Sequence, residues 1–536
     1  MMVPLEQRTV VHMLREGARR HPERTAVRDQ QSELTYGQLL ERSAGAAAAL
    51  RELGVAPGDP VLLMLGNHVD HVVAWFGASC ARAVEVPLNT ELQAPQLSYI
   101  ANHCEARVLV IDAGCVDRLR AAAGELRHLE HVIVRGEADG LDELPFTVHD
   151  IELLRRAEPG PIAELNPWDP SGIMYTSGTT GPPKGVVVSH AQTYGRMLPL
   201  GAGSPQPGDT TLVTLPIYHV IGQCRGLYNT LIAGGTAVLE PRFSASRFWD
   251  SCRKHQVTYV PLVGVMATYL LRQPARQDDA DNPVQRICLG TTIREVDRFR
   301  QRFAIPELYV SYGLTEVGGV LVGPAESTGC GWLRDDFEGL LVDEHDVAVA
   351  PGEVGELVLR PTEPWTVMLG YHKRPEETMA RWRNLWLHTG DLMRQREDGM
   401  LIFVDRRSDR IRHHGENVST GEVEQHIVAY PAVHECAVVG IASSDDEAPG
   451  DQDILAVVVP ASGENLDPGR LIEFLSHRLP RFAVPRFVRI VAELPRTDST
   501  RRVRKSVIAE QGAAGAWERP GASRVTAPHA ADGGAS

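Results

Sequence analysis

Hydrophobic residues recur along the first part of this chain in two alternating patterns. Residues 10–23 and 35–54 space their apolar side chains three or four positions apart, which predicts amphipathic helices. Residues 60–66 and 106–113 are short apolar runs bounded by turn-forming residues, which predicts buried strands. Residues 71–83, between these runs, again show helical spacing. Strands that alternate with helices predict an α/β fold in which helices cover the faces of a sheet.

The alternation continues through the middle of the chain and then changes. Further strands are predicted at residues 211–216, 235–240, 257–263 and 307–313. From about residue 353 the chain becomes rich in strands, and beyond residue 406 a smaller α/β unit follows. Its predicted elements lie at residues 421–430, 435–443, 453–461, 469–479 and 486–495. The predicted fold class is α/β, with a large N-terminal domain of mixed sheets and helices, a strand-rich subdomain and a small C-terminal α/β domain.

Composition excludes several classes of protein. The 536 residues carry a formal net charge of -15, which argues against non-specific nucleic-acid binding, because a phosphate backbone requires basic surface. The N-terminus lacks a signal-peptide core, and no run of eighteen apolar residues occurs. We therefore expect a cytoplasmic protein without a membrane segment. Eight scattered cysteines without a C-x-x-C pair indicate neither a disulfide scaffold nor a zinc site. Monomer and homodimer both stay open.

The stretch YTSGTTGPPKG, residues 175–185, is the first candidate for chemistry. It joins two apolar strand-like runs and combines three glycines, several hydroxyls and one lysine. Glycines permit close backbone approach, and successive backbone amides can form a concave anion site. The alternative is a flexible surface loop, but a linker has no use for this density of threonine beside a lone lysine. The stretch is not a Walker A loop, because it lacks that spacing.

This stretch resembles the phosphate loop of the adenylate-forming superfamily, which contains acyl-CoA synthetases, peptide-synthetase adenylation domains and luciferases. Three further stretches match in the family's order: YGLTE at 312–316, LHTGD at 387–391, and DRRSDRIRHHGENVSTGEVE at 405–424. The stretches GEVGELVLRP at 352–361 and MLGYHKRPEETMARW at 368–382 also fit the family. The resemblance spans about residues 10–505 and is closest to small-acid CoA ligases of the carnitine/crotonobetaine type. It implies ATP and Mg²⁺ as cofactors and CoA as the acceptor.

The resemblance also implies a role for each matching residue. The residues implied to hold the phosphates of ATP are Thr176, Ser177, Gly178, Thr179, Thr180 and Lys184. Thr315 would contact the α-phosphate, and Glu316 would bind Mg²⁺. Tyr312 would lie near adenine, Asp391 would accept the ribose hydroxyls, and Arg406 would add a ribose or phosphate contact. His219 would gate or stack on the substrate, although such a histidine is otherwise often a packed core residue.

The acyl pocket departs from the family pattern. Where the family has a small-residue G-G-A-P segment, this chain has LGTTI at 289–293. The lining residues expected from family order are Tyr259, Val263, Gly264, Val265, Gly290, Thr291 and Thr292. The polar, branched threonine pair suggests a small or polar substrate.

The C-terminal region departs as well. The family implies a domain 1–404, a hinge at 405–408 with Ser408 in place of Asp or Lys, and a mobile domain 409–510. Residues 511–536 are rich in Ala, Gly and Pro, which predicts a disordered tail. The family lysine of the pattern P-[RK]-T-x-[ST]-G-K-[IV] is replaced by Arg502, and Lys505 follows three positions later. Arg502 either does the work of the lysine, in a chain with only four lysines, or marks altered chemistry, since the two cations differ in shape.

These observations predict an ATP-dependent enzyme that activates a small or aromatic carboxylate as acyl-AMP, releases pyrophosphate and transfers the acyl group to CoA. One alternative keeps the adenylation step and activates nitrite to diazotise an aromatic amine in secondary metabolism. It is motivated by the threonine pair and the missing lysine. Another alternative is a module that binds ATP or an acyl-adenylate without turnover. Retention of Lys184, Thr315, Glu316 and Asp391 argues against this last class.

Overall fold

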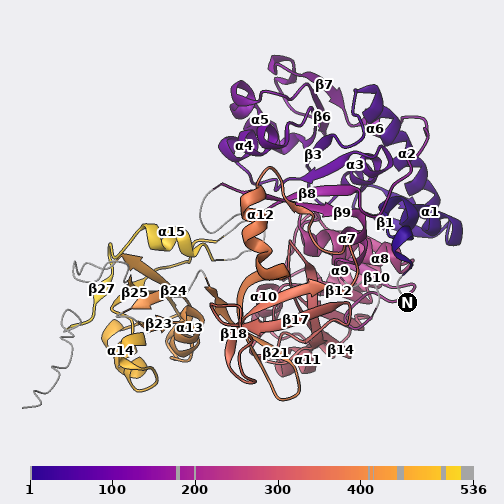
Figure 1. Ribbon diagram of the computed structural model, residues 1–536. Helices are drawn as coiled ribbons and strands as arrows, with labels where there is room; N and C mark the ends of the chain where they lie inside the picture. Colours follow the sequence, from indigo (N-terminus) through magenta and orange to yellow (C-terminus); the bar gives the residue numbers. More distant parts are fainter. Residues whose placement is uncertain are drawn as a thin grey trace, which may run out of the picture. The chain divides into compact units, whose positions relative to one another are not determined.

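The computed structural model divides the chain into two compact units. The first comprises residues 1–389 and 394–403, and the second comprises residues 390–393 and 404–536. The structure describes residues 3–176, 182–197, 201–407, 411–413, 416–442, 452–496 and 503–520. No described helix is long and apolar enough to cross a membrane. Mixed sheets and helices in the first unit and a smaller α/β arrangement in the second confirm the predicted fold class (Figure 1).

The N-terminal half of the first unit is built on an eight-stranded sheet. Its order is β19 (Gly370–Tyr371), β9 (Lys184–Ser189), β8 (Pro170–Thr176), β4 (Val84–Pro87), β3 (Pro60–Met64), β5 (Val108–Asp112), β6 (His131–Arg135) and β7 (Thr147–Asp150). The run from β4 to β7 is parallel. The connecting helices are α3 (Val69–Cys80), α4 (Ala94–Cys104) and α5 (Val116–Ala122), and α6 (Glu152–Arg155) follows β7.

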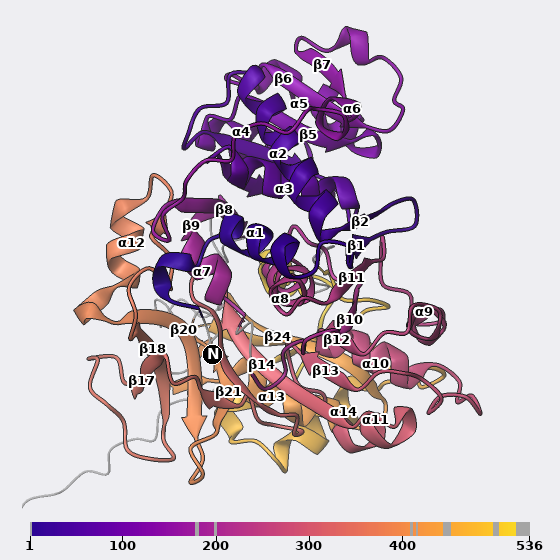
Figure 2. The same ribbon diagram turned by 90° about the vertical axis from the view of Figure 1, so that its right-hand side faces the viewer.

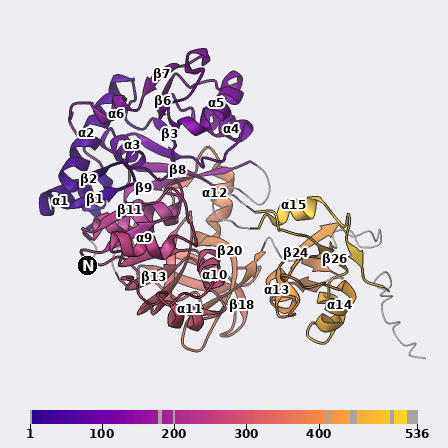
Figure 3. The same ribbon diagram turned by 180° about the vertical axis from the view of Figure 1, so that it is seen from behind.

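Alternate residues of β3 serve two different cores. Val61 and Leu63 pack in the cluster that contains α1 (Val10–Arg20), α2 (Tyr36–Glu52) and α3, whereas Leu62 and Met64 pack with α4 and α5 (Figure 3). This alternation is the period of a strand that is buried on both faces. Every residue of α3 is buried, which identifies it as an internal helix between layers (Figure 2). A capping box between Thr35 and Gln38 starts α2 at the position that its sequence predicts.

A second, nine-stranded sheet carries most of the candidate site. Its order is β16 (Trp332–Leu333), β15 (Gly318–Pro324), β14 (Glu307–Leu314), β13 (Arg286–Leu289), β12 (Tyr259–Leu262), β10 (Thr210–Val213), β11 (Thr236–Leu239), β1 (Thr25–Arg28) and β2 (Glu33–Thr35). The helices of this region are α7 (His190–Gly195), α8 (Asn229–Ile232), α9 (Phe248–His255), α10 (Gly264–Arg272) and α11 (Val296–Phe303). The π-helix η5 (Ile221–Tyr228) precedes α8. Leu262, Leu289 and Val310 are in register on parallel β12, β13 and β14, so the residues after them meet at one sheet edge.

A four-stranded sheet follows in the order β17 (Phe337–Val342), β18 (Val354–Pro361), β20 (Leu387–Gln395) and β21 (Leu401–Arg406), and α12 (Pro375–Arg381) lies between β19 and β20 in the chain. The strands β18, β20 and β21 lie in the stretch expected to be strand-rich from about residue 353, whereas β17 precedes it. These three strands account for the strand-rich texture of that stretch of the sequence.

The second unit is a four-stranded sheet with helices. Its strands, in order, are β24 (Val433–Ala442), β25 (Gln452–Pro460), β26 (Phe487–Ile490) and β27 (Trp517–Glu518). Its remaining elements are β22 (Ile411–His413), β23 (Glu416–Val418), α13 (Thr420–Val428), α14 (Pro468–Ser476) and α15 (Lys505–Glu510). The strand β27 lies inside the segment predicted to be disordered. It is ordered because Trp517 packs on the core of this unit and Glu518 pairs with Arg486 at 2.8 Å. Residues 521–536 lie outside the described part.

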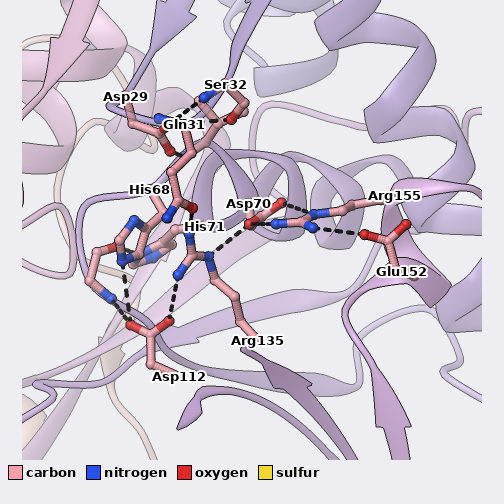
Figure 4. Close-up of polar contacts among 12 residues, drawn as sticks. Asp29, Gln31, Ser32, His68, Asp70, His71, Asp112, Arg135, Glu152 and Arg155 are labelled. Carbon is pink, nitrogen blue, oxygen red and sulfur yellow. Dashed lines mark hydrogen bonds and ion pairs between the residues drawn. The ribbon is translucent and has the colours of Figure 1, made fainter. Parts of the chain in front are cut away.

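A charged network ties together the carboxyl ends of β3, β5 and β6 (Figure 4). Asp70, in the first turn of α3, accepts hydrogen bonds from Arg135 at 2.8 Å and from Arg155 at 2.7 and 2.8 Å. Asp112 accepts a 2.7 Å bond from the backbone amide of Gly66. Burial alone would raise the pKa of Asp70, but the hydrogen bonds from Arg155 and Arg135 outweigh it and hold that pKa below its ordinary value. The network therefore stabilises the ionised carboxylate.

Candidate active site

The turn between β14 and β15 presents the two residues expected to act on phosphate and metal. Thr315 and Glu316 occupy this turn, directly after Leu314. Gly318 follows with a φ of +83°, and a Cβ there would lie 2.1 Å from the carbonyl oxygen of Arg196. Only glycine fits that position. The local sequence therefore folds into a tight turn pressed against the residue that follows α7.

Two side chains from the α7 region hold the turn by its backbone. Gln192 Nε2 donates to the carbonyl oxygen of Glu316 at 2.9 Å, and Arg196 Nη2 donates to the carbonyl oxygen of Thr315. Both donors are buried. Backbone pinned in this way fixes where the two side chains point, which is the preorganisation that charge stabilisation in catalysis requires.

The carboxylate of Glu316 is held on one side only. The hydroxyl of Tyr371 donates to Oε1 at 2.8 Å, and Arg381 Nη2 lies 3.5 Å from the same oxygen. Burial raises the pKa of the Tyr371 phenol, so it remains a donor. Oε2 accepts no hydrogen bond from the described residues. That oxygen is therefore available to a cation.

The donor set fits magnesium. No group of three or more His, Cys, Asp or Glu side chains with metal-binding geometry occurs among the described residues. Mg²⁺ needs no such group, because it is commonly bound by one or two carboxylates together with substrate phosphates and water. Glu316 supplies one carboxylate of this kind.

Lys184 belongs to the same cluster. It opens β9 opposite Thr176 on β8, so the two residues flank the glycine-rich connection. Its ammonium forms an ion pair with Glu377 and lies 5.5 Å from the centroid of the Tyr371 ring. The hydrogen bond from Lys184 holds the pKa of Glu377 below its ordinary value. Lys184 thus lies over the ring of Tyr371, and Glu316 contacts its hydroxyl.

The remaining phosphate-loop candidates, Ser177, Gly178, Thr179 and Thr180, lie outside the described residues. The hydroxyl of Thr176 donates to the carbonyl oxygen of Lys184 at 3.4 Å, which is a long hydrogen bond. The phosphate-binding role of this loop stays a prediction.

The candidate ribose residues meet within the second unit. Asp391 is buried on β20, and Arg406 Nε lies 3.1 Å from its Oδ1. The neighbouring Asp405 accepts hydrogen bonds from the Ser419 hydroxyl at 2.9 Å and from the Gly421 amide at 3.4 Å. A carboxylate at the N-terminus of a helix is favoured by the helix dipole. The first residue of the predicted hinge, Asp405, is therefore anchored to the start of α13, while Ser408 lies outside the described residues.

Tyr312 ends up half-buried near the end of β14, paired with Leu321 of β15. Most of the expected pocket residues follow the ends of β12 and β13, whereas Tyr259 begins β12 and donates its hydroxyl hydrogen bond to the Gly203 carbonyl. Thr291 Oγ1 accepts a 3.1 Å hydrogen bond from the amide of Gly264, and a Cβ on Gly264 would lie 2.7 Å from that oxygen. The hydroxyl of Thr292 donates to the carbonyl of Glu326.

Both threonine hydroxyls are thus already engaged with the backbone of the protein. Their interaction with a substrate stays a prediction. A Cβ on Gly290 would lie 3.2 Å from Cδ1 of Ile221, so η5 forms the wall opposite this glycine. Val263, which precedes α10, is the next neighbour of that same Cβ at 3.5 Å.

His219 stands two residues before η5. Its ring lies 4.9 Å from the ring of Tyr218, and its backbone carbonyl accepts from Gln223 at 2.8 Å. Its Nε2 is shut off from solvent and has no hydrogen-bond partner among the described residues. Burial lowers the pKa of His219 to about 4, so the imidazole is neutral at pH 7. A neutral ring suits stacking or gating better than charge stabilisation.

Arg502 lies outside the described residues. Lys505 begins α15 and is fully engaged: its Nζ lies 2.7 Å from the Thr420 hydroxyl and 2.8 Å from Glu424 Oε1. Sequence reasoning also missed Gln192, Arg196, Tyr371 and Arg381. The only signal was that Tyr371 and Arg381 fall in MLGYHKRPEETMARW, a stretch that resembles the family without an assigned role.

Comparison with known proteins decides the family. The family model described as "AMP-binding enzyme" matches residues 14–372, which is more than half of the chain, and the model described as "AMP-binding enzyme C-terminal domain" matches residues 422–501. The chain belongs to the AMP-binding enzyme family. The resemblance to adenylate-forming enzymes that the motifs indicated is confirmed.

Individual members of the family extend the comparison. A crotonobetaine/carnitine–CoA ligase of Salmonella paratyphi A is 30% identical over 485 residues, covering 89% of this chain and 93% of the relative. A benzoate CoA ligase from Burkholderia xenovorans LB400 is 26% identical with a TM-score of 0.81, covering 94% of this chain and 99% of that one. An anthranilate CoA ligase in complex with anthranoyl-AMP shares the fold at 23% identity and a TM-score of 0.82, covering 95% and 98%.

Proposed function

We propose that this protein is an ATP-dependent ligase that activates a small or aromatic carboxylate as acyl-AMP, releases pyrophosphate and transfers the acyl group to CoA. The observation that carries the proposal is the cluster in which the Lys184 ammonium lies over the Tyr371 ring and Glu316, on its hydrogen-bonded turn, accepts from the Tyr371 hydroxyl. A cation and a carboxylate in this arrangement suit a polyphosphate with its bound metal ion. Relatives named for benzoate, anthranilate and carnitine all act on carboxylates.

Each residue of the cluster has a defined task in this proposal. Lys184 would neutralise charge on the departing pyrophosphate, and breaking its pair with Glu377 would release the ammonium for that purpose. Glu316 would hold Mg²⁺ through Oε2, and the bound ion would supply neutralisation of phosphate oxygens during displacement at the α-phosphorus. Tyr371 and Arg381 would orient the carboxylate of Glu316. Asp391 and Arg406 would hold the ribose.

The test is AMP release from ATP and Mg²⁺ with a panel of small and aromatic carboxylates, with and without CoA. We expect AMP and pyrophosphate in equal amounts with at least one acid, and a thioester only when CoA is present. Glu316→Gln should slow AMP formation, with a rise in activation free energy on the order of 2–4 kcal/mol. Absence of AMP with every acid in the panel would refute the proposal.

The nitrite alternative rests on the sequence departures at Thr291, Thr292 and Arg502, and a separate arm with nitrite and aromatic amines tests it. Formation of AMP and a diazo product in that arm alone would show that the activated substrate is nitrite and not a carboxylate. A non-catalytic binding module would bind ATP without forming AMP in either arm. The pinned turn that carries Glu316 favours turnover, since a module that only binds ATP has little need of an oriented metal carboxylate.

A further inference from the structure

The guanidinium of Arg225 is a buried charge without a counter-ion. Arg225 lies in η5 and is 2% exposed. Its Nη1 donates to the carbonyl oxygen of Gly203 at 3.2 Å, and its Nη2 lies 3.9 Å from the Met197 sulfur. It has no ion pair with any described residue. An ionised group in such a position is costly unless an opposite charge joins it.

Several other buried arginines have carboxylate partners, whereas Arg489 donates to Gln511 Oε1 at 3.0 Å and to the Gly512 carbonyl oxygen. Arg334 lies 2.6 Å from Asp336, and Arg486 lies 3.0 Å from Asp453. Arg196 lacks a direct pair, but the carboxylates of Glu316 and Glu85 are among its principal electrostatic neighbours. The principal electrostatic neighbours of Arg225 are Cys288, Tyr259 and Cys224, none of which is a carboxylate. Unlike Arg334 and Arg486, Arg225 therefore has no carboxylate partner among the described residues.

The buried carboxyl group of Glu85 is committed to another residue of η5. Glu85 receives hydrogen bonds to both oxygens from Gln223 Nε2, each at 3.0 Å. Tyr259 adds no negative charge, because its hydroxyl donates to the same Gly203 carbonyl at 2.9 Å. The protein thus supplies a neutral polar setting around the guanidinium. The missing partner is an anion.

The location links this charge to the proposed acyl pocket. Residues four or five apart share a face of a helix with i→i+5 hydrogen bonds, so Arg225 follows Ile221 on one face of η5. Ile221 is the residue that forms the wall opposite Gly290. A Cβ on Gly319, beside the turn that carries Glu316, would lie 3.2 Å from Arg225 Nη2. Arg225 is thus one turn of η5 beyond Ile221, and its guanidinium lies beside the β14–β15 turn that carries Glu316.

We infer that Arg225 recognises a small anionic group, which makes the substrate an acid with a second negative charge at the end remote from the reacting carboxylate. The inference rests on the proposed function for the identity of the reacting group. The same chemistry would serve a small free oxyanion such as nitrite. A quaternary ammonium at the remote end, as in carnitine, is excluded by repulsion from the uncompensated guanidinium.

The test compares acids of matched length that differ in remote charge. AMP release is measured with butyrate and succinate, with benzoate and terephthalate, and with carnitine, while a further arm contains nitrite and an aromatic amine. The variants are Arg225→Met, Arg225→Lys and, as the matched control, Arg298→Met, which removes an exposed arginine of α11 that pairs with Glu295. We expect kcat/KM of the wild type to favour the diacid by about 10- to 100-fold. Arg225→Met should lose this preference, because KM should rise more for the diacid than for the monoacid. Arg225→Lys should keep part of the preference, and Arg298→Met should behave as wild type.

The failure of the inference and the failure of the proposed function give different results. AMP release without a preference for the second charge, or an equal loss for both acids in Arg225→Met, overturns the inference and leaves the ligase. If AMP forms only with nitrite and the KM for nitrite rises in Arg225→Met, the anion site is supported and the proposal of a carboxylate substrate is overturned. If no arm forms AMP, thermal unfolding decides: stabilisation by succinate, terephthalate or nitrite that Arg225→Met abolishes supports the site. Equal unfolding temperatures with and without these anions refute it.

Discussion

The hydroxyl of Tyr371 donates a 2.8 Å hydrogen bond to Oε1 of Glu316, and the same tyrosine ring lies 5.5 Å from the ammonium of Lys184. One aromatic side chain thus connects the candidate metal carboxylate with the candidate phosphate cation. Tyr371→Phe keeps the ring and removes only the donor. We expect slower AMP formation. The activation free energy should rise by about 1.5–3 kcal/mol, the usual value of a hydrogen bond to a charged group.

The Mg²⁺ dependence of Tyr371→Phe tests this orienting role. A carboxylate without its donor should require a higher Mg²⁺ concentration for half-maximal rate. An unchanged Mg²⁺ titration together with a lower rate would show that the tyrosine acts on something other than Glu316.

Lys184→Met should slow AMP formation and raise its activation free energy by on the order of 2–4 kcal/mol, because it removes a cation from the departing phosphates. Its unfolding temperature should remain close to wild type, since the partly exposed pair with Glu377 contributes little to stability. The control is Lys373→Met, which removes an exposed ammonium paired with Glu105 in the same region. A similar loss of activity in both variants would contradict the specific role of Lys184.

Arg502→Ala separates two interpretations of the C-terminal substitution. If Arg502 serves as the cation of the adenylation step, this change should slow AMP formation. Lys505→Ala should instead weaken the second unit, because the Lys505 ammonium is committed to two residues of α13, Thr420 and Glu424. Unchanged AMP formation in Arg502→Ala would exclude the surrogate role.

Asp70→Asn should destabilise the first unit by about 1.5–3 kcal/mol, because two arginines lose their shared carboxylate. The native pKa of Asp70 is depressed, so its stabilising effect is present above the ordinary aspartate pKa of about 3.9 and is lost as the pH falls through the lower native value. Chemical denaturation at pH 7 gives the difference. Equal stabilities of wild type and variant at pH 7 would show that the network is energetically neutral.

His219 should contribute to acid sensitivity. Its native pKa is about 4 and that of an unfolded histidine is 6.5, so between these values the unfolded chain binds a proton that the folded protein does not. Stability is therefore lost as the pH falls through this window. His219→Asn should reduce the loss between pH 7 and pH 5 by about 1–2 kcal/mol. The exposed His345→Asn is the control, and an identical acid dependence in all three proteins would disprove the burial argument.

The fold could be predicted where the cause is local. The Thr35 cap, the spacing of α2 and the apolar run of β3 are properties of neighbouring residues, and the structure confirms the α/β class. Motif order led to Lys184 and Glu316 for the same reason, since each stands in a short stretch with its own signature. The catalytic roles of these residues stay predictions.

Other features depend on distant parts of the chain and left no local signal. Tyr371 reaches Glu316 across 55 positions, and Gln192 reaches it across 124. The burial of Arg225 without a carboxylate is likewise a property of the packed unit, because nothing in the stretch QCRGLYN distinguishes it from a surface arginine. The strand β27 formed in a segment of disorder-prone composition because Trp517 found a core to pack on.

The stretch that begins at Lys184 and ends at Arg196 has a consequence for protein engineering. It carries the candidate phosphate cation at one end and, twelve positions later, the guanidinium that grips the Thr315 carbonyl at the other. This stretch and the hairpin turn around Gly318 should therefore be exchanged together when segments are swapped between homologues. Recombination that imports either piece from a homologue alone would mismatch donor and acceptor, whereas joint transfer of both would preserve the fit.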